Sequence, residues 1–238
     1  GKLPEPETLL DCIAMELARE KDMAGLHVTV TAGPTQEALD PVRYLTNHST
    51  GRMGYAIARE AMLRGADVTL ISGPTALKPV PGVKTVDVVS ARDMFEAVQA
   101  ALPETDILVK AAAVADYRPM SIAEDKIKKQ DGDMAIPLER TDDILGWVAE
   151  HRHPGLFVCG FSMETRDMVE NSRKKLEKKN MDMIAANNVK VAGAGFQVDT
   201  NQLTLITRED LLELPLVTKE EAADLLLDEI LKRMGQER

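Results

Sequence analysis

The residues best suited to chemistry follow an apolar run near the start of the chain. The run Val28–Ala32 ends at Gly33 and Pro34, and the segment Asn47–Gly54 (NHSTGRMG) precedes a helical pattern. Amide and hydroxyl side chains at a helix start, together with its unpaired backbone N–H groups, are suited to holding a phosphate. We therefore expect a ligand loop here, with the following candidate residues: Gly33, Asn47, Ser49 and Gly51.

This loop fits neither common nucleotide fingerprint. Gly33, Gly51 and Gly54 are spaced too widely for G-x-G-x-x-G, and the chain has no G-x-x-x-x-G-K-[ST] sequence. The alternative is that the prolines and glycines only shape a long βα loop, with Ser49 or Thr50 as an ordinary helix N-cap. Loops of this length inside compact domains tend to be functional, so both interpretations stay open at this point.

A second candidate segment, KAAAVADYRP, runs from Lys110 to Pro119. Its small side chains allow a ligand to approach closely. Asp116 would then lie at the carboxyl end of a strand, placed to bind a base edge or a metal. The alternative is a turn or N-cap aspartate with Arg118 as its partner, because Asp is favoured in both settings.

Two lysine clusters stand out in a chain that is acidic overall. Lys126, Lys128 and Lys129 are predicted on both faces of a short strand, where they would meet an anionic substrate or protect a solvated sheet edge. Lys175 and Lys179 are four residues apart and share one face of a predicted helix. Charged helix faces are usually just solvated, but this helix lies between two strands that lead into the same crevice.

Composition and charge narrow the classes of function. The 238 residues carry a formal net charge of -10, which argues against a nucleic-acid partner, because binding a polyanion normally needs a basic surface. No apolar run is long enough to span a membrane, and the start lacks the layout of a signal peptide. The two cysteines suit a reducing compartment and are too few for a dedicated metal site, so we expect a cytoplasmic protein. Cys159 is expected to be a buried structural thiol.

Strand and helix patterns alternate along the chain, which predicts an α/β fold: a doubly wound, mostly parallel, Rossmann-like sheet with helices on both faces. The expected strands are His27–Ala32, Asp67–Ser72, Thr85–Val89, Ile107–Ala111, Phe157–Phe161 and Met183–Ala186. The expected helices are Gly54–Leu63, Ala91–Ala101, Asp142–Glu150, Met168–Lys179 and Glu220–Met234.

Two regions depart from this alternation. The segment Asp125–Glu139 predicts two short strands around Asp131-Gly132-Asp133, and hence a hairpin or flap protruding from the main sheet. The runs Gln202–Thr207 and Glu213–Thr218 predict a second, C-terminal hairpin around Arg208-Glu209-Asp210.

Together these elements resemble the phosphopantothenoylcysteine synthetase family, in particular the bacterial synthetase half of the bifunctional coenzyme A enzyme. The matching stretches are TAGPTQEALDPVRYLTNHSTGRMGYAIA, ISGP, AAAVADYRP, KIKK, GFSMET, KLEKKNMDMIAANN and LPLVTKEEAADLLLDEI. The resemblance covers nearly the whole chain from Leu26 onward. Residues 26–238 are therefore expected to form the synthetase domain, after a linker and helix at residues 1–25.

The resemblance implies a ligase of coenzyme A biosynthesis that joins 4′-phosphopantothenate to L-cysteine, with CTP as co-substrate and Mg²⁺ as cofactor. The acid would first become an acyl-cytidylate, with release of pyrophosphate, and the cysteine amine would then displace CMP. Lys126 is implied in forming the acyl-cytidylate and Asn47 in turning it into product. Arg43 is expected to hold the phosphate or carboxylate of the substrate.

The resemblance also implies the residues that contact the nucleotide. They are Gly33, Ser49, Gly51, Lys110, Ala112, Asp116, Lys126, Phe161, Lys175 and Lys179, with a helix start at Asp142, Asp143, Ile144 and Leu145 completing the pocket. Two departures from the family pattern bear on this set. Many members have Pro at the position of Asp142, and several relatives have a small or apolar residue in place of Lys110, so that contact is expected through the backbone.

The resemblance implies partners as well as substrates. The family is usually dimeric, so we expect a homodimer in which the hairpin Asp125–Glu139 acts as a flap or reaches toward a partner. In bacterial chains a flavin-dependent decarboxylase half usually precedes the synthetase half, so decarboxylation is expected to come from another segment. No nucleic-acid or membrane partner is expected.

The residues alone leave two other functions open. An NAD(P)-type Rossmann oxidoreductase would share the sheet, but it requires an intact glycine fingerprint and a ribose-binding acid about 20 residues on, and neither is evident. A nucleotide-binding module without turnover would explain the crevice but not why Asn47 occurs together with the lysine cluster. Nothing in the residues alone separates CTP from ATP.

Overall fold

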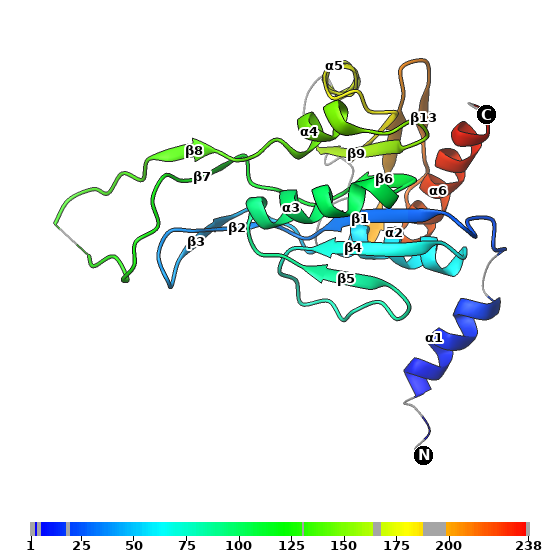
Figure 1. Ribbon diagram of the computed structural model, residues 1–238, viewed down its shortest axis with the longest axis horizontal. Helices are drawn as coiled ribbons and strands as arrows, with labels where there is room; N and C mark the ends of the chain where they lie inside the picture. Colours follow the sequence, from blue (N-terminus) through cyan, green and yellow to red (C-terminus); the bar gives the residue numbers. More distant parts are fainter. Residues whose placement is uncertain are drawn as a thin grey trace.

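The computed structural model describes residues 3, 6–17, 20–129, 131–163, 168–187 and 199–236. Its centre is one sheet, built mainly from six parallel strands: β1 (His27–Ala32), β4 (Asp67–Ser72), β5 (Lys84–Asp87), β6 (Ile107–Lys110), β9 (Phe157–Met163) and β10 (Met183–Asn187). Two antiparallel strands, β12 (Leu203–Ile206) and β13 (Leu211–Glu213), extend it at one edge. The strand order is β13-β12-β10-β9-β6-β1-β4-β5, and Figure 1 shows its part β9-β6-β1-β4-β5.

The strand order confirms the predicted doubly wound sheet. From β1 the chain builds outward through β4 and β5, then returns to the middle and builds the other half from β6 through β9 to β10. The order therefore reverses between β1 and β6, which are parallel neighbours. In sheets of this kind ligands bind beyond the carboxyl ends of the strands at such a reversal. The expected ligand loop follows β1, and the segment that begins with Lys110 follows β6.

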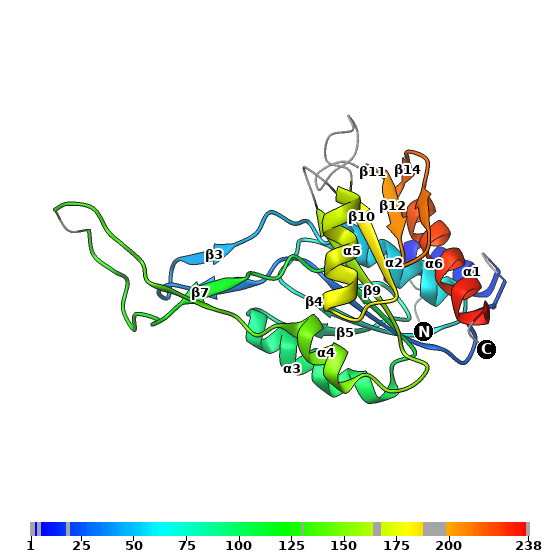
Figure 2. The same ribbon diagram turned by 90° about the horizontal axis from the view of Figure 1, so that it is seen from above.

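Helices cover both faces of the sheet, as expected for buried parallel strands. On one face lie α2 (Arg52–Leu63) and α6 (Lys219–Gln236), which pack on apolar side chains that include Val30 and Val109. On the other face lie α3 (Ala91–Ala101), α4 (Ile144–His151) and α5 (Met168–Lys178), which enclose a second cluster around Leu108 and Ile184. Figure 2 shows α3 and α4 across the sheet from α2 and α6. A short 3-10 helix, η1 (Leu102–Glu104), follows α3.

The N-terminal segment contains one helix, α1 (Pro6–Leu17), which contacts α2. Within the expected linker and helix at residues 1–25, residues 1–2, 4–5 and 18–19 lie outside the described residues. No helix in the described part of the chain is long and apolar enough to cross a bilayer.

Two short ladders extend from the carboxyl edge of the sheet and form an arm. In the first ladder β2 (Gln36–Ala38) pairs with β3 (Tyr44–Thr46), and in the second β7 (Tyr117–Pro119) pairs with β8 (Leu138–Arg140). We use the term arm for the described residues of 36–46 and 117–140. The loop between β7 and β8 reaches furthest from the sheet (Figure 1).

The predicted flap is confirmed as a protruding hairpin, but the prediction of its strands is wrong. None of the described residues between 120 and 137 belongs to a strand, so Lys126, Lys128 and Lys129 lie in a loop. The chain bends at Asp131 and Gly132, where Gly132 has a φ of 104°, but no ladder joins the described residues immediately on either side of this bend. The ladder forms instead at the base of the loop, where Arg118 pairs with Glu139 at 2.8 Å.

The C-terminal hairpin is confirmed around the predicted turn, but its second strand is wrong in position: it is Leu211–Glu213 and shares only Glu213 with the predicted Glu213–Thr218. Thr207 and Asp210 close the turn, because the Asp210 N–H donates to Thr207 Oγ1 at 3.0 Å, and β13 begins directly afterwards. Pro215 ends the region that can pair. Val217–Thr218, predicted as part of the same strand, forms a separate strand, β14, that pairs with β11 (Thr200–Asn201).

Candidate active site

The loop that leads into α2 turns sharply at Gly51. This residue precedes the first helical turn and has a φ of 78°, a conformation that glycine adopts without the steric cost of a Cβ. No side chain caps α2; Ser49 Oγ instead accepts a hydrogen bond from the Gly51 N–H at 3.3 Å. The alternative in which Ser49 or Thr50 is an ordinary N-cap is therefore wrong.

The first turn of α2 lines a cavity of about 140 Å³, which we call the α2 cavity. Four of the predicted nucleotide contacts line it: Ser49, Gly51, Ala112 and Phe161. The backbone of Gly33 packs directly beneath Gly51, where a Cβ on Gly51 would lie 3.4 Å from the Gly33 Cα. Gly33 therefore supports the loop and does not itself line the cavity.

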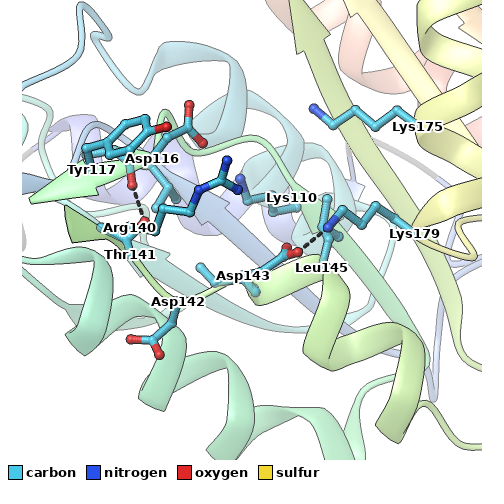
Figure 3. A pocket seen from close by; sticks show the side chains of 13 residues that line it. Lys110, Asp116, Tyr117, Arg140, Thr141, Asp142, Asp143, Leu145, Lys175 and Lys179 are labelled. Atoms are coloured by element: carbon cyan, nitrogen blue, oxygen red, sulfur yellow. Dashed lines mark hydrogen bonds and ion pairs between the residues drawn. The ribbon is translucent and has the colours of Figure 1, made fainter.

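A second cavity, of about 420 Å³, contains most of the other predicted contacts (Figure 3). We call it the lysine cavity; the predicted residues that line it are Lys110, Asp116, Asp142, Asp143, Ile144, Leu145, Lys175 and Lys179. Lys175 in α5 and Lys179, which follows α5, extend into the cavity from one side, whereas Asp116 extends into it from the base of the arm. Most of the predicted nucleotide residues thus divide between two cavities, whereas Gly33 and Lys126 line neither. Phe161 is not in the cavity that holds Lys110, Lys175 and Lys179.

Charges in the lysine cavity influence one another. Burial lowers the pKa of Lys110 to about 8, and the positive charge of Lys175 contributes to the shift. Asp143 is the N-cap of α4, accepts a hydrogen bond from the Gly146 N–H at 3.0 Å, and forms an ion pair with Lys179. Burial acts to raise the pKa of Asp143, but the hydrogen bonds from Lys179 and Gly146 outweigh it, and the pKa is lower than usual.

The two cavities share one wall, the segment 110–117. Lys110 and Val114–Tyr117 line the lysine cavity, whereas Ala111–Ala113 line the α2 cavity. Asn47 is attached where these two stretches meet, because its Nδ2 donates to the carbonyl of Ala113 at 3.4 Å and to that of Val114 at 3.1 Å. The amide of Asn47 is thereby fixed at the boundary between the cavities.

The structure does not bring Arg43 and Lys126 together with Asn47. Both line a separate, larger cavity of about 830 Å³ in the arm. The guanidinium of Arg43 binds Asp40 Oδ2 through Nε at 3.0 Å and Nη2 at 2.5 Å, and Nη2 also donates to the Ile127 carbonyl at 3.0 Å. Arg43 therefore has a structural partner within the chain and holds the loop beside Lys126.

Asp40 is a site residue that the sequence analysis missed. Its Oδ2 also accepts a hydrogen bond from the Ile127 N–H at 3.1 Å. Asp40 and Arg43 therefore both bind the backbone of Ile127 and attach the loop between β7 and β8 to the loop between β2 and β3. The hydrogen bond from Arg43 holds the pKa of Asp40 well below its usual range. The Asp40-Pro41 pair, a common turn signal, was the one indication in the sequence.

Further lining residues were also missed. Tyr117, Arg140 and Thr141 line the lysine cavity, and the Arg140 guanidinium lies 5.9 Å from the centre of the Tyr117 ring. Arg118 pairs with Glu139, so the alternative in which Arg118 is the partner of Asp116 is wrong. The register of the β7–β8 ladder places Arg140 opposite Tyr117, and this pairing could not be read from the separated segments.

Two further observations limit the chemistry of the site. Cys159 is fully buried, and burial raises the pKa of its thiol to about 12, as expected for a structural cysteine. Within the described residues, no group of three or more His, Cys, Asp or Glu side chains is arranged to hold a metal ion.

The chain matches the family of the DNA/pantothenate metabolism flavoprotein C-terminal domain over residues 23–234. It belongs to this family. It is 45% identical over 234 residues to the coenzyme A biosynthesis bifunctional protein CoaBC of Bacillus subtilis (strain 168), a match that covers 97% of this chain and 57% of that protein. The CoaBC protein of Escherichia coli (strain K12) is 43% identical over 239 residues, with coverage of 99% and 59%. The chain thus spans less than two thirds of these curated relatives.

Solved structures of family members agree with the fold. The crystal structure of the C-terminal domain of CoaBC is 44% identical and covers 90% of this chain and 99% of that chain, with a TM-score of 0.76. The DNA/pantothenate metabolism flavoprotein of Streptococcus pneumoniae is 28% identical and covers 88% and 100%, with the same TM-score. A Cab2 variant in complex with phosphopantothenate-cysteine is 16% identical, with a TM-score of 0.75, and shows likeness of fold alone. These matches confirm the family resemblance and the fold class; the roles of individual residues stay predictions.

Proposed function

We propose that this chain is a ligase domain that joins 4′-phosphopantothenate to L-cysteine and converts CTP to CMP and pyrophosphate. Its curated relatives are bifunctional proteins of coenzyme A biosynthesis, which supports this class of reaction. The observation that carries the proposal is the position of Asn47 at the boundary of two cavities whose linings suit a nucleotide. A carboxylate is a poor acyl donor, so the reaction requires activation before cysteine attacks.

The first step would take place where the cavities meet. A carboxylate oxygen of 4′-phosphopantothenate attacks the α-phosphorus of CTP, and the bond from that phosphorus to the β-phosphate oxygen breaks to release pyrophosphate. Lys110, Lys175 and Lys179 would hold the nucleotide in the lysine cavity by neutralising its phosphates, with the start of α4 beside it. Fixed cations that meet developing charge stabilise the transition state more than the ground state.

The second step would use the same boundary. The amine of cysteine attacks the acyl carbon, the bond to the phosphate oxygen breaks, and CMP leaves as the amine loses a proton. The Asn47 amide would orient the activated carbonyl, because its nitrogen is already fixed by two backbone carbonyls. Mg²⁺ would enter with the triphosphate, which binds it through phosphate oxygens and whose charge it partly neutralises.

Lys126 and Arg43 fit this scheme if the protein is a homodimer. Within one chain both residues line the cavity in the arm, and neither lines the lysine cavity or the α2 cavity. Apolar side chains exposed on the arm favour a protein contact there: Val42, Tyr44, Met120, Ile122, Met134 and Leu138. We propose that the arm packs on a second copy and delivers Lys126 to the partner's acyl-transfer site. Full activity from a protein that light scattering shows to be a monomer would reject this arrangement.

The bifunctional relatives are longer than this chain, which supports a decarboxylase half elsewhere in the full-length protein. We also propose that the protein prefers CTP to ATP and that it is located in the cytoplasm.

The test measures pyrophosphate release from CTP, ATP and GTP with 4′-phosphopantothenate and Mg²⁺, with and without cysteine. We expect release to be selective for CTP, and we expect Asn47→Ala to accumulate acyl-cytidylate without forming product. Asn171→Ala, at an exposed position of α5, is the control and should behave like the wild type. If the wild type releases no pyrophosphate from any nucleotide but retains bound CTP in the presence of both substrates, the chain is a nucleotide-binding module.

A further inference from the structure

The lysine cavity has acids as well as cations in its lining, and the acids limit how strongly it attracts an anion. Among the described residues, four cationic side chains line it together with three acids, Asp116, Asp142 and Asp143. The cations therefore exceed the acids by one charge. An acid that turns toward the lysines forms an ion pair there and takes the place of a ligand phosphate. The direction in which each acid points therefore affects anion binding.

Asp142 and Asp143 are neighbours at the start of α4, and their side chains point in different directions. Asp143, the N-cap, forms an ion pair with Lys179, so it already binds one cation of the cavity. Figure 3 shows the Asp142 carboxylate turned away from Lys110, Lys175 and Lys179. Two adjacent acids thus differ in whether they bind the lysines, and the contacts of Asp142 explain the difference.

The cation that binds Asp142 is Arg92, which belongs to α3 and does not line the lysine cavity. Arg92 Nη1 lies 3.4 Å from each of the two carboxylate oxygens of Asp142. Two contacts within α3 hold the rest of the Arg92 side chain. Its Nε donates to Glu96 Oε1 at 2.7 Å, and its guanidinium lies 5.6 Å from the centre of the Phe95 ring. These contacts restrict the guanidinium and keep it beside Asp142.

Aromatic packing sets the separation of α3 and α4. Phe95 of α3 meets Trp147 of α4 edge to face, with ring centres 5.9 Å apart, and Trp147 also stacks on His151 at 4.1 Å. Such ring pairs have a preferred geometry, so they favour one relative placement of the two helices. Arg92 and Asp142 lie at the starts of these helices, so this packing holds them within reach of each other.

We propose that Arg92 is a positioning residue, which holds the Asp142 carboxylate away from the lysine cavity and leaves the lysines to the phosphates of the nucleotide. This inference rests on the proposed function. Without Arg92, the Asp142 carboxylate would lose its partner on α3 and would be attracted to the cations of the cavity. It would then compete with the phosphates for those cations, and its uncompensated charge would repel the phosphates.

The test is calorimetric binding of CTP with Mg²⁺, without the other substrates, to the wild type, to Arg92→Met and to the double variant Arg92→Met/Asp142→Asn. We expect the CTP Kd to rise roughly fivefold in Arg92→Met, which corresponds to about 1 kcal/mol. The double variant lacks the carboxylate that Arg92→Met releases, so its Kd should return to within twofold of the wild type. A residue that only stabilised the fold would show no such recovery.

Two further variants serve as controls. Lys232→Met makes the same change in net charge at an exposed residue of α6 that pairs with Glu229, and its CTP Kd should stay within twofold of the wild type. Arg92→Lys keeps the charge but not the planar fork of the guanidinium. It should therefore bind CTP more tightly than Arg92→Met.

Three results would each overturn the inference: unchanged CTP binding in Arg92→Met, weakening that persists in the double variant, and no CTP binding by the wild type. Equal weakening in Lys232→Met would also overturn it, because net charge alone would then explain the effect. Binding is measured without turnover, so the two hypotheses fail separately. A wild type that follows the expected binding pattern but forms no product contradicts only the ligase. An active wild type whose Arg92→Met variant binds CTP unchanged contradicts only the role of Arg92.

Discussion

Lys110 combines a half-buried position with a charge that a nucleotide would stabilise. Its pKa is about 8 in the free protein, and phosphates in the cavity would raise it. Below pH 8 Lys110 is charged before and after binding, so affinity is highest there. Above pH 8 binding must take up a proton, so affinity should fall by up to about tenfold per pH unit. We expect the Kd for CTP to rise between pH 7.5 and 9.5.

The control for this pH dependence is Lys110→Met, whose weaker binding should change little over the same range. Binding is measured by calorimetry at constant ionic strength, because salt alone screens charged contacts. A wild-type Kd that is constant from pH 7.5 to 9.5 would show that Lys110 does not contact the anion, in agreement with a contact through its backbone.

Cys159 should be chemically silent in the folded protein. It is fully buried, and its pKa of about 12 leaves almost no thiolate at neutral pH. We expect Cys159→Ala and the wild type to give the same titre with a thiol reagent under native conditions, and to differ by one thiol in denaturant. A native titre that falls in the variant would contradict the buried position.

At the scale of residues, the sequence predicted many of the side chains that line the cavities, but it did not predict all of their contacts. Lys110, Asp116 and Lys175 were expected in one pocket and do line one cavity. Lys110 ends β6 and Asp116 follows it, whereas Lys175 reaches the cavity from α5. Arg43 and Lys126 were expected at the same pocket and are not there. Spacing along a chain does not reveal that Arg43 is bound by Asp40.

At the scale of elements, Arg64 joins three segments. It follows α2, is 5% exposed, and its guanidinium reaches Asp22 at 2.5 Å, Asp224 at 3.3 Å and Asp228 at 2.8 Å. Arg64→Met would leave these acids without their shared partner and should lower the free energy of unfolding by about 3 kcal/mol. Asp228→Asn should cost less than about 1 kcal/mol, since the Asp228 side chain is exposed. Urea denaturation measures both, and equal losses would contradict this role for Arg64.

The contact between α2 and β1 gives a second prediction. A Cβ on Gly54 would lie 2.6 Å from the Cβ of Ala32, so Gly54→Ala must push the start of α2 away from the strand. We expect a loss of roughly 1 to 3 kcal/mol in unfolding free energy. Gly235→Ala, where nothing lies within 4 Å, is the control and should not destabilise the protein. Unchanged stability in Gly54→Ala would mean that this contact relaxes freely.

Periodicity identified the long elements and missed the short ones. The helices α2, α3 and α6 were predicted to within a few residues, because each buries one apolar face. The ladders of the arm have strands of only three residues, too short for any alternation to be visible. The Lys126 segment was read as a strand because it precedes the turn signal Asp131-Gly132-Asp133. A strand also needs a partner, and none of the described residues forms a ladder with this segment.

At the scale of the whole molecule, the arm and the sheet separate the predicted catalytic residues. Lys126 lies on the arm, and Asn47 lies at the cavities beside the sheet. If each acyl-transfer site takes Asn47 from one chain and Lys126 from its partner, two inactive variants should complement each other. A dimer of one Asn47→Ala chain and one Lys126→Ala chain contains one intact site and one doubly damaged site.

We therefore expect a co-refolded equimolar mixture of Asn47→Ala and Lys126→Ala to recover about a quarter of wild-type product formation, because random pairing makes half of the dimers mixed and each has one of two sites intact. Each variant refolded alone should stay inactive, and light scattering should show dimers throughout. If dimers form but the mixture stays as inactive as its components, Lys126 acts on the cavities of its own chain, and the arm must fold back toward the sheet during the reaction.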